Sequence, residues 1–452
     1  MTAPKDTVFD PKKFSACLET LHGQAPEFIE THISWVYLLP TLAYKVKKPV
    51  NLGFLDFSSC SNRRYYCEEE LRLNGRFSDL YLDVIPIGDK GQSYTLDEVA
   101  EPIEFVVRMH RFPSDSLFLT LLEQGLLEGR HMEALGERIG QFHRSGCHHL
   151  SYPSGPSPDD ILKHALDNLD GISGLLEASD SAFREALEQI RIWTIETFGQ
   201  LKSLFSHRHE ASVMLEGHGD LHLRNIVLLD EVPTPFDGIE FSVALRTLDP
   251  MNEIAFLLMD LEVRGAFGLG AHFLNRYLEE SEDYEGLPLL PFYKVYRACV
   301  RAKIALIDRS QSSTPKGRTR ATKESRHYLD YALGLTLAEI KPVLILLHGY
   351  SGSGKTTLAK NLMPELRAIH LRTDQVRKSL EGLAHDEASD PTERGRIYHP
   401  EQRDLVYQRM IAWGEAILRS GYSLLLDATF LQRSARDRAL EMAQRVGVPP
   451  LI

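Results

Sequence analysis

Residues 343–358 read VLILLHGYSGSGKTTL, and this stretch decides the fold of the C-terminal part of the chain. The apolar run VLILL precedes Gly349-Tyr-Ser-Gly-Ser-Gly354-Lys355-Thr356, which fits the pattern G-x-x-x-x-G-K-[ST]. With a strand before it and a helix after it, this pattern predicts a loop that cradles phosphates. Glycines let successive backbone N–H groups turn toward phosphate oxygens, and the following helix presents its positive end to the same anion.

The residue types around this loop predict how a nucleotide and Mg²⁺ would be held. Lys355 is expected to reach the outer phosphates, and the Thr356 hydroxyl is expected to ligate the ion. A second apolar run, residues 423–426, ends at Asp427, a carboxylate placed to organise the same Mg²⁺. The predicted nucleotide-binding residues of the loop are Gly349, Ser351, Gly352, Ser353, Gly354, Lys355, Thr356 and Thr357.

Asp374 and Arg377 follow the first predicted helix, in HLRTDQVR at 370–377. Asp374 has two interpretations: it accepts a proton from a substrate hydroxyl, or it caps the helix that starts at Gln375. Residues 342–452 resemble small-molecule and zeta-toxin-like P-loop kinases, in which a D-x-x-R pair occupies this place. The resemblance implies an α/β domain with a parallel sheet, and kinases of this kind continue with more strands. We therefore expect a P-loop NTPase or kinase domain that is short at its C-terminus.

A second motif lies in EGHGDLHLRNIVLL, residues 216–229. Its His218-x-Asp220-x-x-x-x-Asn225 spacing is that of the catalytic loop of protein-kinase-like folds. We expect Asp220 to orient or deprotonate an acceptor hydroxyl and Asn225 to ligate Mg²⁺. The resemblance to these folds also implies a downstream Asp that binds Mg²⁺, and two acids of this sequence compete for that place. Glu240 is slightly favoured by its I-E-F context, and Asp237 is kept as the alternative.

The H-G-D form of this motif resembles aminoglycoside and choline phosphotransferases. That resemblance implies a bilobal α+β kinase-like domain over residues 1–335, with a strand lysine that binds nucleotide phosphates and a helix glutamate that holds the lysine. Lys45 is the first choice for the lysine, with Lys47 next on the same strand face. Glu70 is the first choice for the glutamate, ahead of Glu68.

Composition sets the broad class of the protein. Hydrophobic residues make up 43% and charged residues 25% of the 452 residues, so a disordered or fibrous chain is excluded. The formal net charge of −12 argues against nucleic acid or a membrane surface as a general partner. No apolar run approaches the roughly 18 residues of a membrane span. The five cysteines are odd in number and show no CxxC pair, so we predict thiols and a cytoplasmic location.

The whole arrangement resembles bacterial proteins in which a phosphotransferase-like domain is fused to an AAA-type ATP-binding domain. We predict an enzyme, a kinase that uses ATP and Mg²⁺ to phosphorylate a small hydroxylated molecule, with a second ATP-binding domain at 342–452. The alternative is a non-catalytic nucleotide sensor. The polar, basic stretch 309–323 is predicted to be an exposed loop or linker. Neither the phosphoryl acceptor nor the oligomeric state can be read from the sequence.

Overall fold

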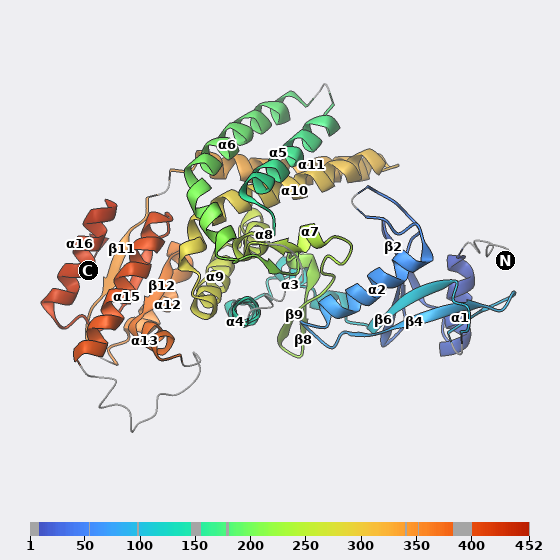
Figure 1. The fold of residues 1–452 in the computed structure, drawn as a ribbon, viewed down its shortest axis with the longest axis horizontal. Helices are drawn as coiled ribbons and strands as arrows, with labels where there is room; N and C mark the ends of the chain where they lie inside the picture. The colour runs from blue at the N-terminus through green and yellow to red at the C-terminus, as the bar shows by residue number, and fades with distance from the viewer. Residues whose placement is uncertain are drawn as a thin grey trace. The chain divides into compact units, whose positions relative to one another are not determined.

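The computed structural model describes residues 9–53, 55–96, 99–145, 155–177, 180–339, 341–350, 352–382 and 400–451 (Figure 1). The chain divides into two compact units. The first comprises Met1–Leu127 and Glu216–Leu248, and the second comprises Glu128–Leu215 and Asp249–Ile452. The boundary predicted between residues 335 and 342 falls inside the second unit and stays a prediction.

The first unit is built on a six-stranded sheet in the order β1-β2-β3-β6-β4-β5, in which every neighbouring pair is antiparallel. Its elements are α1 (Pro11–His22), β1 (Glu27–Glu30), β2 (Ser34–Leu38), β3 (Leu42–Lys47), α2 (Cys60–Asn74), β4 (Tyr81–Asp89), β5 (Tyr94–Thr95), β6 (Glu104–His110) and α3 (Phe118–Glu123). The second part of this unit adds the short elements β8 (Ile226–Leu229), β9 (Val232–Pro235), α7 (Val243–Arg246) and β10 (Thr247–Leu248), and it begins within β7 (Leu215–Glu216).

Alternation along β3 gives the sheet two different faces. Tyr44 and Val46 pack in one apolar cluster with Phe14 of α1. Ala43 points the other way and packs in a second cluster with Cys67 of α2. Lys45 and Lys47 share the side of Ala43, so the pleat directs both lysines toward α2. The strand and the helix expected to carry Lys45 and Glu70 are confirmed as β3 and α2.

The second unit combines a layer of helices with a parallel sheet. Its helical elements before residue 340 are α4 (Gly129–Arg144), α5 (Pro158–Leu175), α6 (Ser181–Glu210), α8 (Pro250–Val263), α9 (Phe267–Ser281), α10 (Leu290–Gln311) and α11 (Pro315–Leu337). The predicted loop at 309–323 is wrong, because α10 continues to Gln311 and α11 begins at Pro315. The Thr314 side chain accepts from the N–H of Gly317 and Pro315 occupies the first helical position, so the helix has a proper start.

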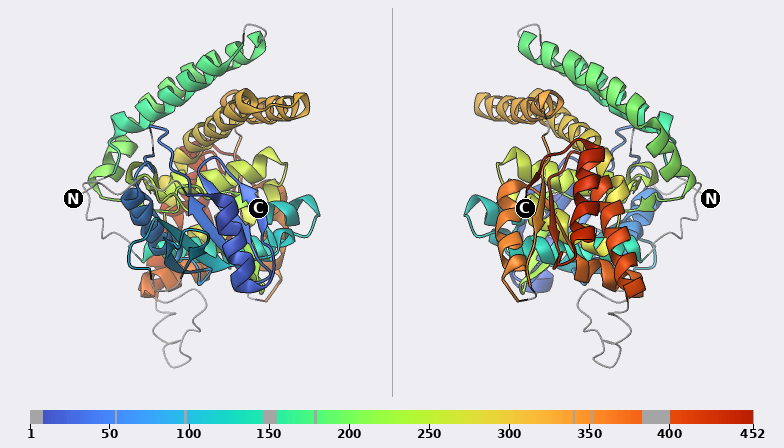
Figure 2. Two further views of the ribbon diagram at one scale, coloured as in Figure 1. Left: turned by 90° about the vertical axis from the view of Figure 1, so that its right-hand side faces the viewer. Right: turned by 90° about the vertical axis from the view of Figure 1, so that its left-hand side faces the viewer.

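The sheet of the second unit has the order β12-β13-β11-β14, and all its pairs are parallel. Its elements are β11 (Leu344–Leu347), α12 (Lys355–Leu366), β12 (Ile369–Arg372), α13 (Thr373–Glu381), α15 (Pro400–Arg419), β13 (Leu424–Asp427), α16 (Arg433–Val446) and β14 (Pro450–Leu451). Figure 2, on its right, shows the strands with orange helices on one side and the red helices on the other. The predicted α/β class of this part is confirmed, with apolar strands typical of a parallel sheet covered on both faces.

Helix α9 packs directly against this sheet. Ala271 of α9 shares one apolar cluster with Leu347 of β11, Met363 of α12 and Leu425 of β13. Two hydrogen bonds add to this packing. Nδ2 of Asn275 donates to the carbonyl oxygen of Ala368, and the N–H of His370 donates to Oδ1 of Asn275. The helical layer and the parallel sheet therefore share a core.

In the part of the chain that the structure describes, none of the helices has the length and apolar character of a membrane span. The cytoplasmic location stays a prediction.

Candidate functional site

Lys45 lies on β3 with its ammonium group between two carboxylates. Its Nζ donates to Oε1 of Glu70 at 2.7 Å and to Oδ1 of Asp237 at 2.6 Å. Burial alone would lower the pKa of Lys45, but Asp237 and Glu70 raise it well above its ordinary value. Lys45 therefore stays charged, as its predicted role in phosphate binding requires.

Lys47, two residues further along β3, is fully buried and paired to the same helix. Its Nζ donates to Oε2 of Glu70 at 2.7 Å and also to Oε1 of Glu240. Glu70 thus bridges both lysines, which lower its pKa to about 2 although burial alone would raise it. Glu68 is exposed and pairs with Arg64 on its own helix, so only Glu70 has the predicted contact with β3.

Asp237 and Glu240 lie in different environments. The side chain of Asp237 is 46% exposed, whereas that of Glu240 is 4% exposed and held by Lys47. Burial raises the pKa of Glu240 despite this lysine. Asp237 also has a φ of 60°, a left-handed conformation that residues other than glycine rarely adopt and that is concentrated at functional sites. The geometry favours Asp237 as the residue that could hold a metal ion, the reverse of the preference drawn from the I-E-F pattern.

The catalytic-loop motif is held together by its own hydrogen bonds. Nδ2 of Asn225 donates to Oδ2 of Asp220 at 2.8 Å and to its carbonyl oxygen at 3.1 Å. The carbonyl oxygen of Phe236 lies 2.9 Å from Nε2 of His218. The backbone N–H of Phe236 donates to the carbonyl oxygen of Asn225 at 3.0 Å. Because Phe236 immediately precedes Asp237, these bonds join the loop to the exposed acid. Asp220, Asn225, Asp237 and Lys45 are thus linked within one unit.

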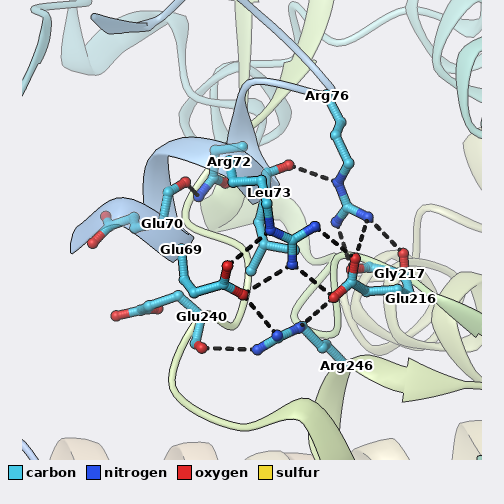
Figure 3. A network of polar contacts seen from close by, with 10 residues as sticks. Glu69, Glu70, Arg72, Leu73, Arg76, Glu216, Gly217, Glu240 and Arg246 are labelled. Carbon is cyan, nitrogen blue, oxygen red and sulfur yellow. Dashed lines mark hydrogen bonds and ion pairs between the residues drawn. The ribbon is translucent and has the colours of Figure 1, made fainter. Parts of the chain in front are cut away.

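Five charged residues that the sequence analysis did not single out form a network of polar contacts with one another (Figure 3). They come from α2, from the turn after it, from the strand before the catalytic loop and from α7, and they are Glu69, Arg72, Arg76, Glu216 and Arg246. Their charges looked like ordinary surface residues in the sequence. Two signals in the sequence could have found this network. Glu69 is next to Glu70, and Glu216 lies two positions before His218.

The phosphate-loop motif forms the predicted turn between β11 and α12. Gly352 and Gly354 have φ values of 81° and 85°, which glycine adopts without strain. The N-cap of α12 is Gly354, which has no side chain that could bond the first N–H groups of the helix, and such N–H groups favour an anion. Lys355 folds back over the turn, with Nζ 2.7 Å from the carbonyl oxygen of Tyr350. Ser351 lies outside the described residues.

Asp427 ends β13 beside this turn, as parallel pairing of β11 and β13 requires. Its Oδ2 accepts from the Thr356 hydroxyl at 2.6 Å and lies 3.3 Å from Nε2 of His370. Burial alone would raise the pKa of Asp427, but the hydrogen bonds from His370 and Thr356 lower it. The structure therefore brings Thr356 and Asp427 together as predicted. His370 was not predicted, because no motif used in the sequence analysis includes it.

Asp374 lies in the first turn of α13 rather than at its cap, which is Arg372. The capping interpretation is therefore wrong. The exposed carboxylate of Asp374 pairs with Arg377 and, at 3.9 Å, with Lys378. Thr357 follows Thr356 on α12 and is exposed. The acid–arginine pair is present where the resemblance to P-loop kinases placed it, and its role stays a prediction.

Comparison with known proteins agrees with the architecture of the C-terminal part. Residues 344–452 match the family described as "AAA domain". This match covers the strand, the phosphate loop and Asp427. Uncharacterized proteins of Mycobacterium tuberculosis and Mycobacterium bovis are 29% identical to this chain over 417 residues, which is 92% of this chain and 80% of each relative. These relatives therefore extend across both compact units.

Solved structures that resemble the chain at low similarity include two kinases. The amicoumacin kinase hAmiN in complex with AMP-PNP, Ca²⁺ and Ami is 12% identical, covers 71% of this chain and 89% of its own, and gives a TM-score of 0.42. The choline kinase of Cryptosporidium parvum Iowa II is 12% identical, covers 68% of this chain and 88% of its own, and also gives 0.42. Because these scores are low, we base the kinase-like arrangement on the contacts of Lys45, Glu70 and the catalytic loop.

Proposed function

We propose that the chain is a phosphotransferase that uses ATP and Mg²⁺ to phosphorylate a hydroxyl group of a small molecule. The observation that carries this proposal is the position of Lys45 between Glu70 and Asp237, in the unit that also carries Asp220 and Asn225. Strand lysine, helix glutamate, catalytic Asp and metal-binding Asn and Asp are the parts that a protein-kinase-like phosphotransferase requires.

Asn225 and Asp237 fit the requirements of Mg²⁺. Both offer oxygen atoms, and Mg²⁺ in nucleotide sites is bound by one or two carboxylates together with substrate phosphates and waters. Accordingly, the described residues contain no cluster of three or more His, Cys, Asp or Glu that would hold an ion alone. When bound, the ion neutralises the charge of the β- and γ-phosphates.

The side chains of this unit would divide the transfer between them. Lys45, oriented by Glu70, binds the phosphates of ATP. Asp220 accepts the proton of the acceptor hydroxyl while the oxygen of that hydroxyl attacks the γ-phosphorus. The bond between the γ-phosphorus and the bridging oxygen of ADP breaks, and ADP and the phosphorylated product leave. Asp220 suits this role because its side chain is 36% exposed and therefore accessible to an acceptor.

The P-loop domain is proposed to bind a second nucleotide with Lys355, Thr356 and Asp427. Its role is that of a second kinase or of a nucleotide-dependent regulator of the first unit. Support comes from the family match over 344–452 and from the Thr356–Asp427 hydrogen bond at 2.6 Å. The nucleotide sensor remains the alternative for the whole chain.

A screen of hydroxylated metabolites with the full-length chain and MgATP tests the proposal, with ADP release as the readout. The Asp220→Asn variant should lose acceptor-dependent ADP release by at least about 100-fold, the usual contribution of a positioned general base. The matched control is Asp230→Asn, an exposed acid in the same unit, which should keep full turnover. Tight binding of ATP without turnover across the panel would support the sensor instead.

A further inference from the structure

Helix α2 presents two neighbouring glutamates to two different parts of its unit. Glu70 faces the lysines of β3, and Glu69 accepts from Arg72 and Arg246 on another side. Successive residues of a helix project about 100° apart, so one helix can hold both contacts together. Any rotation of α2 that displaces Glu69 must therefore also displace Glu70.

Arg246 is the residue that joins Glu69 to the rest of the unit (Figure 3). It is 3% exposed. Its Nη2 donates to Oε2 of Glu69 at 2.9 Å, its Nε to Oε1 of Glu216 at 2.9 Å and its Nη1 to the carbonyl of Glu240 at 2.8 Å. One guanidinium group thus connects α2, the residue before the catalytic loop and the segment that follows Asp237.

Two further arginines bind the C-terminal end of α2 and the turn that follows it to the same place. Arg72 donates to the carboxylate of Glu216 at 2.9 and 3.0 Å. Arg76 donates to the carbonyl oxygens of Glu216 and Gly217 at 2.8 and 3.0 Å. Burial alone would raise the pKa of Glu216, but its arginine partners lower it to about 2, so the anion persists at neutral pH. Gly217 leads directly into His218 and the catalytic loop.

Arg246 is distinguished by its bond to the segment after Asp237 and by its burial. Its side chain is nearly inaccessible, whereas that of Arg72 is 48% exposed. A planar guanidinium can satisfy three acceptors in one fixed geometry, which a lysine ammonium cannot reproduce. Removing it would leave the Glu240 carbonyl without this donor and Glu69 with Arg72 as its partner, so α2 would lose its bond to the segment that follows Asp237.

We propose that Arg246 is a positioning residue that holds α2 so that Glu70 can orient Lys45 for phosphate binding. This inference rests on the proposed function, because it assigns a cause to the lysine–glutamate pair on which phosphoryl transfer depends. Arg246 acts through Glu70 and does not itself touch the nucleotide.

A double-mutant cycle tests the inference with the full-length chain. All variants carry Lys355→Ala, which removes the P-loop lysine, and the measurement is the dissociation constant of AMP-PNP with Mg²⁺. Arg246→Met and Glu70→Gln should each weaken binding about tenfold, corresponding to about 1.4 kcal/mol. Because both act on one contact, the double variant should bind about as weakly as Glu70→Gln alone. Independent effects, which would multiply to about 100-fold, would overturn the inference.

Two further variants separate positioning from general damage. Arg309→Met removes an arginine of the other compact unit that likewise bonds a carboxylate and a carbonyl, and it should leave AMP-PNP binding unchanged. Arg246→Lys retains the charge but not the fork, so it should bind more weakly than the parent and exchange its α2 amides faster. If Arg246→Met does not fold, AMP-PNP binding and α2 amide exchange of Arg246→Lys test the inference instead. Parent-like binding and exchange in Arg246→Lys would contradict the inference, whereas failure of the Lys355→Ala parent to bind AMP-PNP would contradict the proposed function.

Discussion

Replacing Lys47 with methionine should destabilise the first unit more than the same change at an exposed lysine of that unit. The Lys47 side chain is 0% exposed and its ammonium group contacts the carboxylates of Glu70 and Glu240, which are 0% and 4% exposed. Glu70 keeps Lys45 after the substitution, but Glu240 loses its hydrogen-bonded partner. Removing one member of a buried ion pair leaves an uncompensated charge, which costs about 3–5 kcal/mol of unfolding free energy.

The remedy for this loss follows from the same contacts. Glu240→Gln added to Lys47→Met removes the stranded charge, so the double variant should regain at least half of the lost stability.

The stability lost in Lys47→Met should also depend on pH. Burial raises the pKa of Glu240, so in the single variant the folded state holds a proton that the unfolded state releases. The deficit of Lys47→Met should therefore grow as the pH rises from 5 to 8.

Denaturant unfolding combined with hydrogen exchange of peptides from β3 and α2 measures these effects. Local exchange is needed because a chain with two compact units need not unfold in two states. The matched control is Lys12→Met, an exposed lysine of the same unit, which should change stability by less than about 0.5 kcal/mol. A loss below about 1 kcal/mol in Lys47→Met, or no recovery in the double variant, would refute the buried-charge account.

Three further outcomes are expected. Asn275→Ala should destabilise the second unit by about 2–4 kcal/mol in thermal unfolding, because it leaves the carbonyl of Ala368 and the N–H of His370 buried without their partner; a change within error would contradict the contact. Glu216→Gln should be less stable than the wild type at neutral pH, and the gap should close as the pH falls from about 4.5 toward 2, because the pKa of Glu216 is lowered to about 2; a gap that is constant with pH would argue against this. Gly354→Ala should weaken ATP binding to the P-loop in a titration, because φ is 85° there and a side chain adds about 1–2 kcal/mol of strain; unchanged affinity would contradict the role of the turn.

Local sequence patterns were sufficient to predict those parts of the site whose residues lie close together in the chain. The phosphate loop needs a strand, glycines and a helix within 16 residues, and the structure has all three in order. The contact of Lys45 with Glu70 was predicted from the resemblance to aminoglycoside and choline phosphotransferases, because strand alternation places Lys45 and Lys47 on one face and does not choose between them. These are the parts of the site that the sequence specifies most directly.

Burial and long-range pairing decided the rest. Nothing local distinguishes Glu240, which is stabilised by Lys47, from Asp237, which faces solvent. The network around Arg246 joins residues up to 177 positions apart, which no spacing rule detects. The helix that replaced the predicted loop at 309–323 did have a local signal, since Thr314-Pro315 is a typical helix start, but the basic composition concealed it.

The central claim is that each compact unit holds one nucleotide with its own lysine and acid, and the stoichiometry of AMP-PNP binding in the presence of Mg²⁺ tests it most directly. Titration of the full-length chain should give two sites. Asp237→Asn should weaken one of them and Lys355→Ala the other, and the variant with both changes should bind neither tightly. A single site in the wild-type chain, or loss of both sites from either change alone, would contradict the account.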